Sequence, residues 1–145
     1  MCSLCGFQAD EFQRWSSCDE ARDELFAITW TLPRPPFIHQ LATDAYSAQH
    51  LRSEMSPVSK LFPLMGLYMA SELGASGLEI QLAHMHKSTD FDRKNWPNLE
   101  VRPNSFQMNV GHVLQREPDE AIQEWVRLTW ESFASVHKSV CQFCK

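Results

Sequence analysis

The sequence predicts an all-α protein, a single compact bundle of five to six helices whose N- and C-termini are joined by a metal site. Apolar residues recur at spacings of three and four along the chain, and no alternating pattern lasts long enough to predict a strand. Two Cys-x-x-Cys pairs stand at the two ends of the 145 residues. Since no internal repeat or linker separates them, residues 1–145 are interpreted as one helical metal-binding domain.

The first helix is predicted over residues 17–29. Ser16 or Ser17 can cap its N-terminus, and acidic Asp19 and Glu20 occupy the first turn, where they favour the positive end of the helix dipole. Its end is predicted by the proline-rich residues 32–36, because proline removes backbone donors and enforces an extended connection.

The second helix is predicted over residues 37–51. His39, Thr43, Tyr46 and His50 recur within it at intervals of four, three and four. Residues at these spacings lie on one face of a helix. This face therefore carries two histidines and a tyrosine.

The third helix begins at Ser56-Pro57, a cap followed by proline at the first helical position, and ends at Gly74 as C-cap. It is apolar nearly all round, which predicts a central place in the bundle. Pro63 inside it predicts a kink or a later true start.

The remaining chain is divided by polar segments and prolines. A helix is predicted over residues 76–86 and a long loop over residues 87–104. A short turn over residues 109–114 precedes a last helix that starts at Glu117-Pro118 and runs to the second cysteine pair. The helix over 76–86 carries Leu78, Leu82 and Met85 on one side.

The two cysteine pairs predict a four-thiolate metal site formed by Cys2, Cys5, Cys141 and Cys144. Two residues between paired cysteines allow one turn to present both sulfurs to a single ion, and zinc is the metal expected for four thiolates. Gly6 favours the tight turn after the first pair. Iron would use the same ligands, and spacing does not separate the two metals.

Other ligand sets remain open at this point. Cys18 falls near the start of the first helix, within reach of Cys2 and Cys5, so these three cysteines with His39 or His137 form an alternative site. The cysteines could also be ordinary thiols or a disulfide, and Cys18 a small buried thiol.

The histidines suggest a second kind of site. A catalytic metal held in the region of His39, Tyr46, His50 and His137 would leave one coordination position open for water. His39 and His50 are eleven residues apart, about 16 Å along an ideal helix, so one ion cannot bind both. Each histidine alone also has a structural interpretation, and His50 suits the C-terminal end of its helix.

Composition narrows the functional classes. The formal net charge is −5 and the basic residues are scattered, which argues against a nucleic-acid partner. No apolar stretch reaches the roughly 20 residues of a membrane span, and the N-terminus does not resemble a signal peptide, so we expect a cytoplasmic location. A protein partner is compatible with the sequence but nothing in it identifies one.

Much of the chain resembles a known family. The stretch His39-Gln40-Leu41-Ala42-Thr43-Asp44-Ala45-Tyr46-Ser47-Ala48-Gln49-His50, with the opening Cys2-x-x-Cys5-Gly6 and Cys18, is similar to the signature of an uncharacterised family of small, mostly bacterial proteins, a domain of unknown function. The resemblance implies a helical, metal-bearing domain and no particular activity. Cys141 and Cys144 depart from the family pattern, and other members would complete the metal site with Cys18 and a histidine.

The leading functional hypothesis is therefore a small zinc-binding module with a binding or regulatory role and no catalysis, because a closed four-thiolate site has no open coordination position. One alternative is a metal-dependent hydrolase or transferase that uses the histidine region. Another is a redox sensor whose thiolates release zinc when they are oxidised.

Overall fold

The computed structural model describes residues 1–34, 36–100 and 105–145, and every regular element in these ranges is helical. The all-α prediction is confirmed. Pro35 of the proline-rich connection and residues 101–104 of the long loop lie outside the described residues. The helices are α1 (Ala9–Phe12), α2 (Cys18–Trp30), α3 (Ile38–Gln49), α4 (Pro57–Leu73), α5 (Gly77–Lys87), η1 (Arg93–Asn95), α6 (Val110–Leu114), α7 (Pro118–Ser132), η2 (Ala134–Val136) and α8 (His137–Cys144).

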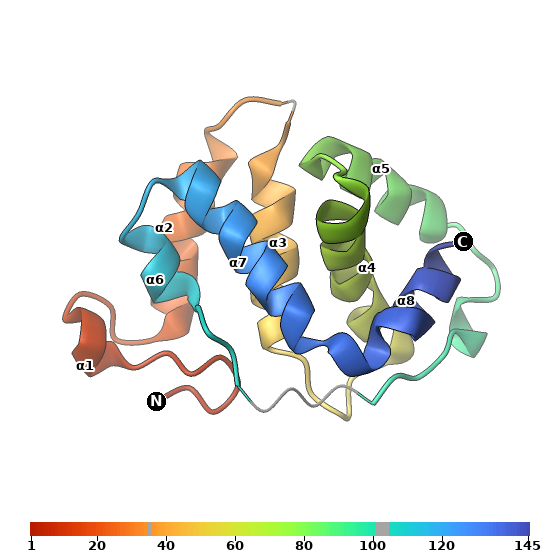
Figure 1. Cartoon of the computed structure of the whole chain (residues 1–145), viewed down its shortest axis with the longest axis horizontal. Coiled ribbons are helices and arrows are strands. Elements are labelled where there is room, and N and C mark those ends of the chain that lie inside the picture. The colour runs from red at the N-terminus through yellow and green to blue at the C-terminus, as the bar shows by residue number, and fades with distance from the viewer. Residues whose placement is uncertain (35, 101–104) are drawn as a thin grey trace.

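Helix α3 lies at the centre of the bundle and packs against α2, α4, α5 and α7 (Figure 1). Helices α2 and α6 lie on one side of it, and α4, α5 and α8 lie on the other. The N-terminus and the C-terminus lie at opposite ends of the molecule in Figure 1. The core between the helices contains large, fully buried side chains, among them Leu25, Leu61, Ile122, Trp125 and Phe133.

Helices α2 and α3 form a hairpin whose ends are set by the sequence. Ser17 caps α2 by accepting a hydrogen bond from the Glu20 N–H, as predicted. Thr29, near the end of α2, lies 2.8 Å from His39 Nδ1 at the start of α3. The start of α2 is therefore at the same level as the end of α3, and this arrangement positions Cys18 beside His50.

Helix α4 begins at Pro57 and passes through Pro63 without interruption, so the later start considered for it is wrong. Proline at position 63 has no N–H, and the Ser59 carbonyl therefore lacks its usual partner four residues on. Gly66 allows α4 to approach α3 closely, because a Cβ there would lie 1.9 Å from Asp44 Oδ2. The buried Asp44 carboxyl group occupies that space.

The single last helix that the sequence predicted is two helices. Helix α7 ends at Ser132, the chain turns through η2, and α8 begins at His137. The His137 ring stacks on Trp130 at 3.9 Å, and its Nε2 lies 2.7 Å from the Trp130 carbonyl, where a continuing helix would place a backbone N–H. Burial of Phe133 at this turn directs α8 onto α4.

Helix α5 is less buried than its apolar residues suggest. It starts with a complete capping box between Ser76 and Glu79, and it buries Ile80. Leu82 and Met85, which the sequence placed on one side with Leu78, are more than half exposed. Within the described residues, no helix has both the length and the apolar character to span a bilayer.

Candidate metal centre

The N-terminal Cys-x-x-Cys pair forms a compact turn. The Cys2 N–H donates to the Phe7 carbonyl at 2.8 Å, and the Gly6 N–H donates to the Cys2 carbonyl at 3.0 Å. Gly6 has φ +83°, a left-handed conformation that side chains rarely adopt, which is the role predicted for it. The turn buries Cys5 and brings it beside Cys2.

The third cysteine comes from the start of α2. Cys18 is the first helical residue after the Ser17 cap, and it is buried. The Tyr46 hydroxyl lies 3.6 Å from Cys18 Sγ and 2.6 Å from Asp19 Oδ1, the shorter contact being the donation to the carboxylate. These contacts connect the start of α2 to α3.

The fourth donor is His50, the C-cap residue of α3. Its Nδ1 lies 2.7 Å from the Tyr46 carbonyl, so Nδ1 carries the proton and donates it. The ring also stacks on Tyr46 at 4.1 Å between centroids. Both contacts fix the imidazole so that the unprotonated Nε2 faces the thiols, the orientation that a metal ligand requires.

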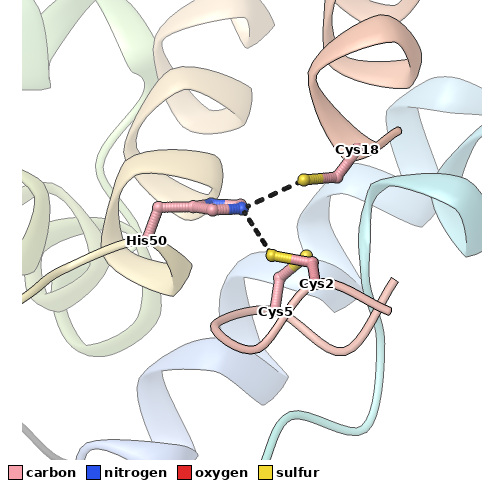
Figure 2. A group of neighbouring side chains, drawn as sticks. All are labelled: Cys2, Cys5, Cys18 and His50. Carbon is pink, nitrogen blue, oxygen red and sulfur yellow. Dashed lines mark hydrogen bonds between the residues drawn. The ribbon is translucent and has the colours of Figure 1, made fainter. Parts of the chain in front are cut away.

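Figure 2 shows the four side chains converging from three segments, with His50 Nε2 directed at Cys2 and Cys18. The Sγ atoms of Cys2, Cys5 and Cys18 and one ring nitrogen of His50 all lie within 4.8 Å of one another. His50 Nε2 is 3.8 Å from Cys2 Sγ and 3.5 Å from Cys18 Sγ. A tetrahedral zinc with ordinary bond lengths places sulfur and nitrogen ligands about 3.6 Å apart, and sulfur ligands about 3.8 Å apart. The donor atoms therefore fit one tetrahedral ion.

The thiols differ in how readily they ionise. Burial disfavours the Cys2 thiolate, but the backbone N–H groups of Cys5 and Leu4 favour it, and the pKa of Cys2 falls below its ordinary value. Burial raises the pKa of Cys5 and of Cys18, and the charges of neighbouring thiolates add to the effect. Burial also lowers the pKa of His50, which keeps the ring neutral. A bound cation would offset the cost of gathering three thiolates.

The structure brings together Cys2 and Cys5 of the predicted ligand set but not Cys141 and Cys144. The second pair lies on α8, where Cys141 Sγ contacts the Tyr68 hydroxyl of α4 at 3.4 Å. Burial raises the pKa of Cys144 to about 11. Helix α8 is on the far side of the bundle from the N-terminal turn (Figure 1).

The two histidines considered as the fourth ligand also lie elsewhere. His39 is at the other end of α3, where its ring packs edge-on against Trp30. His137 is at the junction of α7 and α8, stacked on Trp130. The sequence predicted Cys18 as a possible ligand but not His50 as its companion. The sequence contained the information needed, because two consecutive antiparallel helices place the start of the first, which carries Cys18, beside the end of the second, which carries His50.

These observations define a helical protein with a Cys3His cluster that can bind a metal ion. Residues 1–134 match the family described as a family of unknown function (DUF5946), and the chain belongs to it. The resemblance to an uncharacterised family is thereby confirmed. All four clustered residues are inside the matched range, whereas Cys141 and Cys144 are outside it. No curated protein and no solved structure matches the chain.

Proposed function

We propose that this protein is a noncatalytic binding module in which a structural zinc ion, held by Cys2, Cys5, Cys18 and His50, fixes the N-terminal turn to the α2–α3 hairpin. The observation that carries the proposal is the convergence of four donor atoms within 4.8 Å of one another, with two nitrogen–sulfur distances of 3.8 and 3.5 Å that suit a tetrahedral site. Structural zinc sites use this donor set, Cys3His, and they have no open coordination position for water.

The arrangement of the other histidines supports the noncatalytic assignment. The alternative enzyme site needs at least two of His39, Tyr46, His50 and His137 to converge where water can enter. Tyr46 and His50 do meet at a cleft, but no second imidazole of the group joins them, because His39 packs on Trp30 and His137 on Trp130. His50 Nε2, the nitrogen free to bind a metal, is directed at thiols. Three thiolates and an imidazole would complete the coordination of the ion and leave it no catalytic position.

The metal content of purified variants tests the proposal. We expect elemental analysis of the protein, purified without added metal, to give one zinc per chain. Cys18→Ser and His50→Gln should each lose most of it, because three remaining ligands bind zinc weakly. The matched control is the double variant Cys141→Ser with Cys144→Ser, which removes the two cysteines outside the cluster and should retain its zinc.

Two results would contradict the proposal. Loss of zinc from the double variant would restore the predicted four-cysteine set. Zinc retention by both Cys18→Ser and His50→Gln would show that the cluster of Figure 2 is not the binding site. Iron in place of zinc in the wild type would keep the ligands and change the metal.

A further inference from the structure

A cleft with a volume of about 800 Å³ opens between α2, α3, α4 and α5. This is within the usual range for small-molecule sites. Aromatic rings of Phe26, Tyr46 and Phe62 line it, together with the polar side chains of Asp44 and His84. The cleft thus combines apolar walls with a few polar groups, which is typical of a binding site for an organic ligand.

Asp44 is the most unusual of these groups. The residue is only 4% exposed, and its two carboxylate oxygens each accept a 3.2 Å hydrogen bond from the Gln40 side-chain amide. In the described part of the chain, no basic side chain pairs with it. Burial accordingly raises the pKa of this carboxyl well above its ordinary value. A buried carboxyl without a cationic partner is costly, and a cationic ligand would reduce that cost.

A further acceptor lies along the same cleft. His84 Nε2 is buried and has no hydrogen-bond partner among the described residues. Burial lowers the pKa of His84 to about 4, so the ring is neutral, and the Phe62 carbonyl accepts from its other nitrogen. Nε2 is therefore an acceptor. Ser59 also lines the cleft, and its carbonyl cannot accept from position 63 because Pro63 has no N–H.

The basic group at the cleft is already engaged. Arg22 donates to Asp23 at 2.9 Å and to Asp19 at 3.4 Å, and its guanidinium lies over the Tyr46 ring at 5.2 Å. The free hydrogen-bonding capacity of the cleft is thus mostly that of acceptors. Such a site favours a ligand that donates hydrogen bonds and carries positive charge.

We propose that this cleft binds a small organic amine, with its ammonium group at the Asp44 carboxylate and its apolar part against the aromatic walls. Aromatic faces attract cations and also bury the carbon skeleton of the ligand, so both parts of an amine find a partner here. The inference specifies the ligand of the proposed binding module. The ammonium contact does not depend on the zinc assignment, because neither Asp44 nor His84 is a proposed metal ligand, whereas His50 lines the same cleft and is one.

Isothermal titration calorimetry of the metal-loaded protein with three probes of similar size tests whether the cleft binds an amine. The probes are 2-phenylethylamine, 2-phenylethanol and 3-phenylpropionate, which are cationic, neutral and anionic. We expect the amine to bind most tightly and to raise the melting temperature. Asp44→Asn, which keeps the shape and removes the charge, should weaken amine binding about tenfold or more. Asp10→Asn removes the same charge from the exposed helix α1, outside the cleft, and should change amine binding less than about twofold.

The proposal is overturned if none of the probes binds, if 3-phenylpropionate binds as tightly as the amine, or if Asp44→Asn binds the amine unchanged. Should Asp44→Asn fold poorly, NMR of the wild type gives an independent test, in which the amine should shift the side-chain amide signals of Gln40. Zinc content is measured separately, so failure here and failure of the metal assignment are distinguishable.

Discussion

Removal of the metal with a chelator should loosen one end of the molecule and leave the other intact. The ion would connect the N-terminal turn to the end of α3, and the link from Cys5 to His50 closes a loop of about 45 residues. The chain-entropy relation for a crosslink of that size gives ~4 kcal/mol, about a thousandfold in the unfolding equilibrium. We therefore expect the free energy of unfolding in urea to fall by about this amount in the chelated protein.

Hydrogen exchange locates the effect. Peptides from residues 1–17 and from the end of α3 should exchange faster after chelation, because their anchoring to each other depends on the ion. Peptides from α8 should keep their protection, since α8 is held by packing on α4. The variant Cys141→Ser with Cys144→Ser provides the control and should respond to the chelator as the wild type does.

Loss of protection in α8 together with the N-terminal turn would contradict a metal bound by Cys2, Cys5, Cys18 and His50, because that is the result that a site of four cysteines requires. The same assignment is contradicted if chelation leaves the free energy of unfolding unchanged within about 1 kcal/mol, a difference that denaturation curves resolve.

Three other predictions concern the stability of the protein and the identity of the metal-binding histidine. Gly66→Ala should destabilise the protein by about 1–3 kcal/mol in urea, because its Cβ would meet Asp44 Oδ2, and combining it with Asp44→Ala should cost less than the sum of the two changes. Burial raises the pKa of Asp44, so the carboxyl supports folding at low pH and loses that contribution as pH rises. Relative to wild type, Asp44→Asn should therefore gain stability as pH rises above about 4, the ordinary pKa of the group, and the opposite trend would contradict the assignment. His39→Ala and His137→Ala should both retain the metal in elemental analysis, and loss from either would revive it as the fourth ligand.

The fold was largely predictable because its signals are local. The Ser17 cap, the Pro57 start and the Gly74 end of α4 all depend on a few neighbouring residues, and the structure has them where the sequence predicted. The break between α7 and α8 was missed because it depends on tertiary packing. The contacts of His137 with Trp130 and the burial of Phe133 determine it, and neither appears in helix periodicity.

The candidate site was predictable in part. The spacing of Cys2 and Cys5 identified the turn, and the short distance in sequence to Cys18 suggested a third ligand. The choice of histidine required the pairing of α2 with α3, which places His50 rather than His39 beside Cys18. The two matching Cys-x-x-Cys pairs suggested that both bind one ion. However, their spacing does not determine whether the two segments meet in the folded protein.

The hairpin geometry of the Cys3His cluster has a consequence for following the unfolding of this protein. Cobalt bound by these side chains would absorb visible light only while the turn and the hairpin remain joined. Buried Trp125 and Trp130, in α7, report on the bundle through their fluorescence. If the two signals change at different urea concentrations, the hairpin end opens as a unit of its own, and a single free energy no longer describes the whole chain.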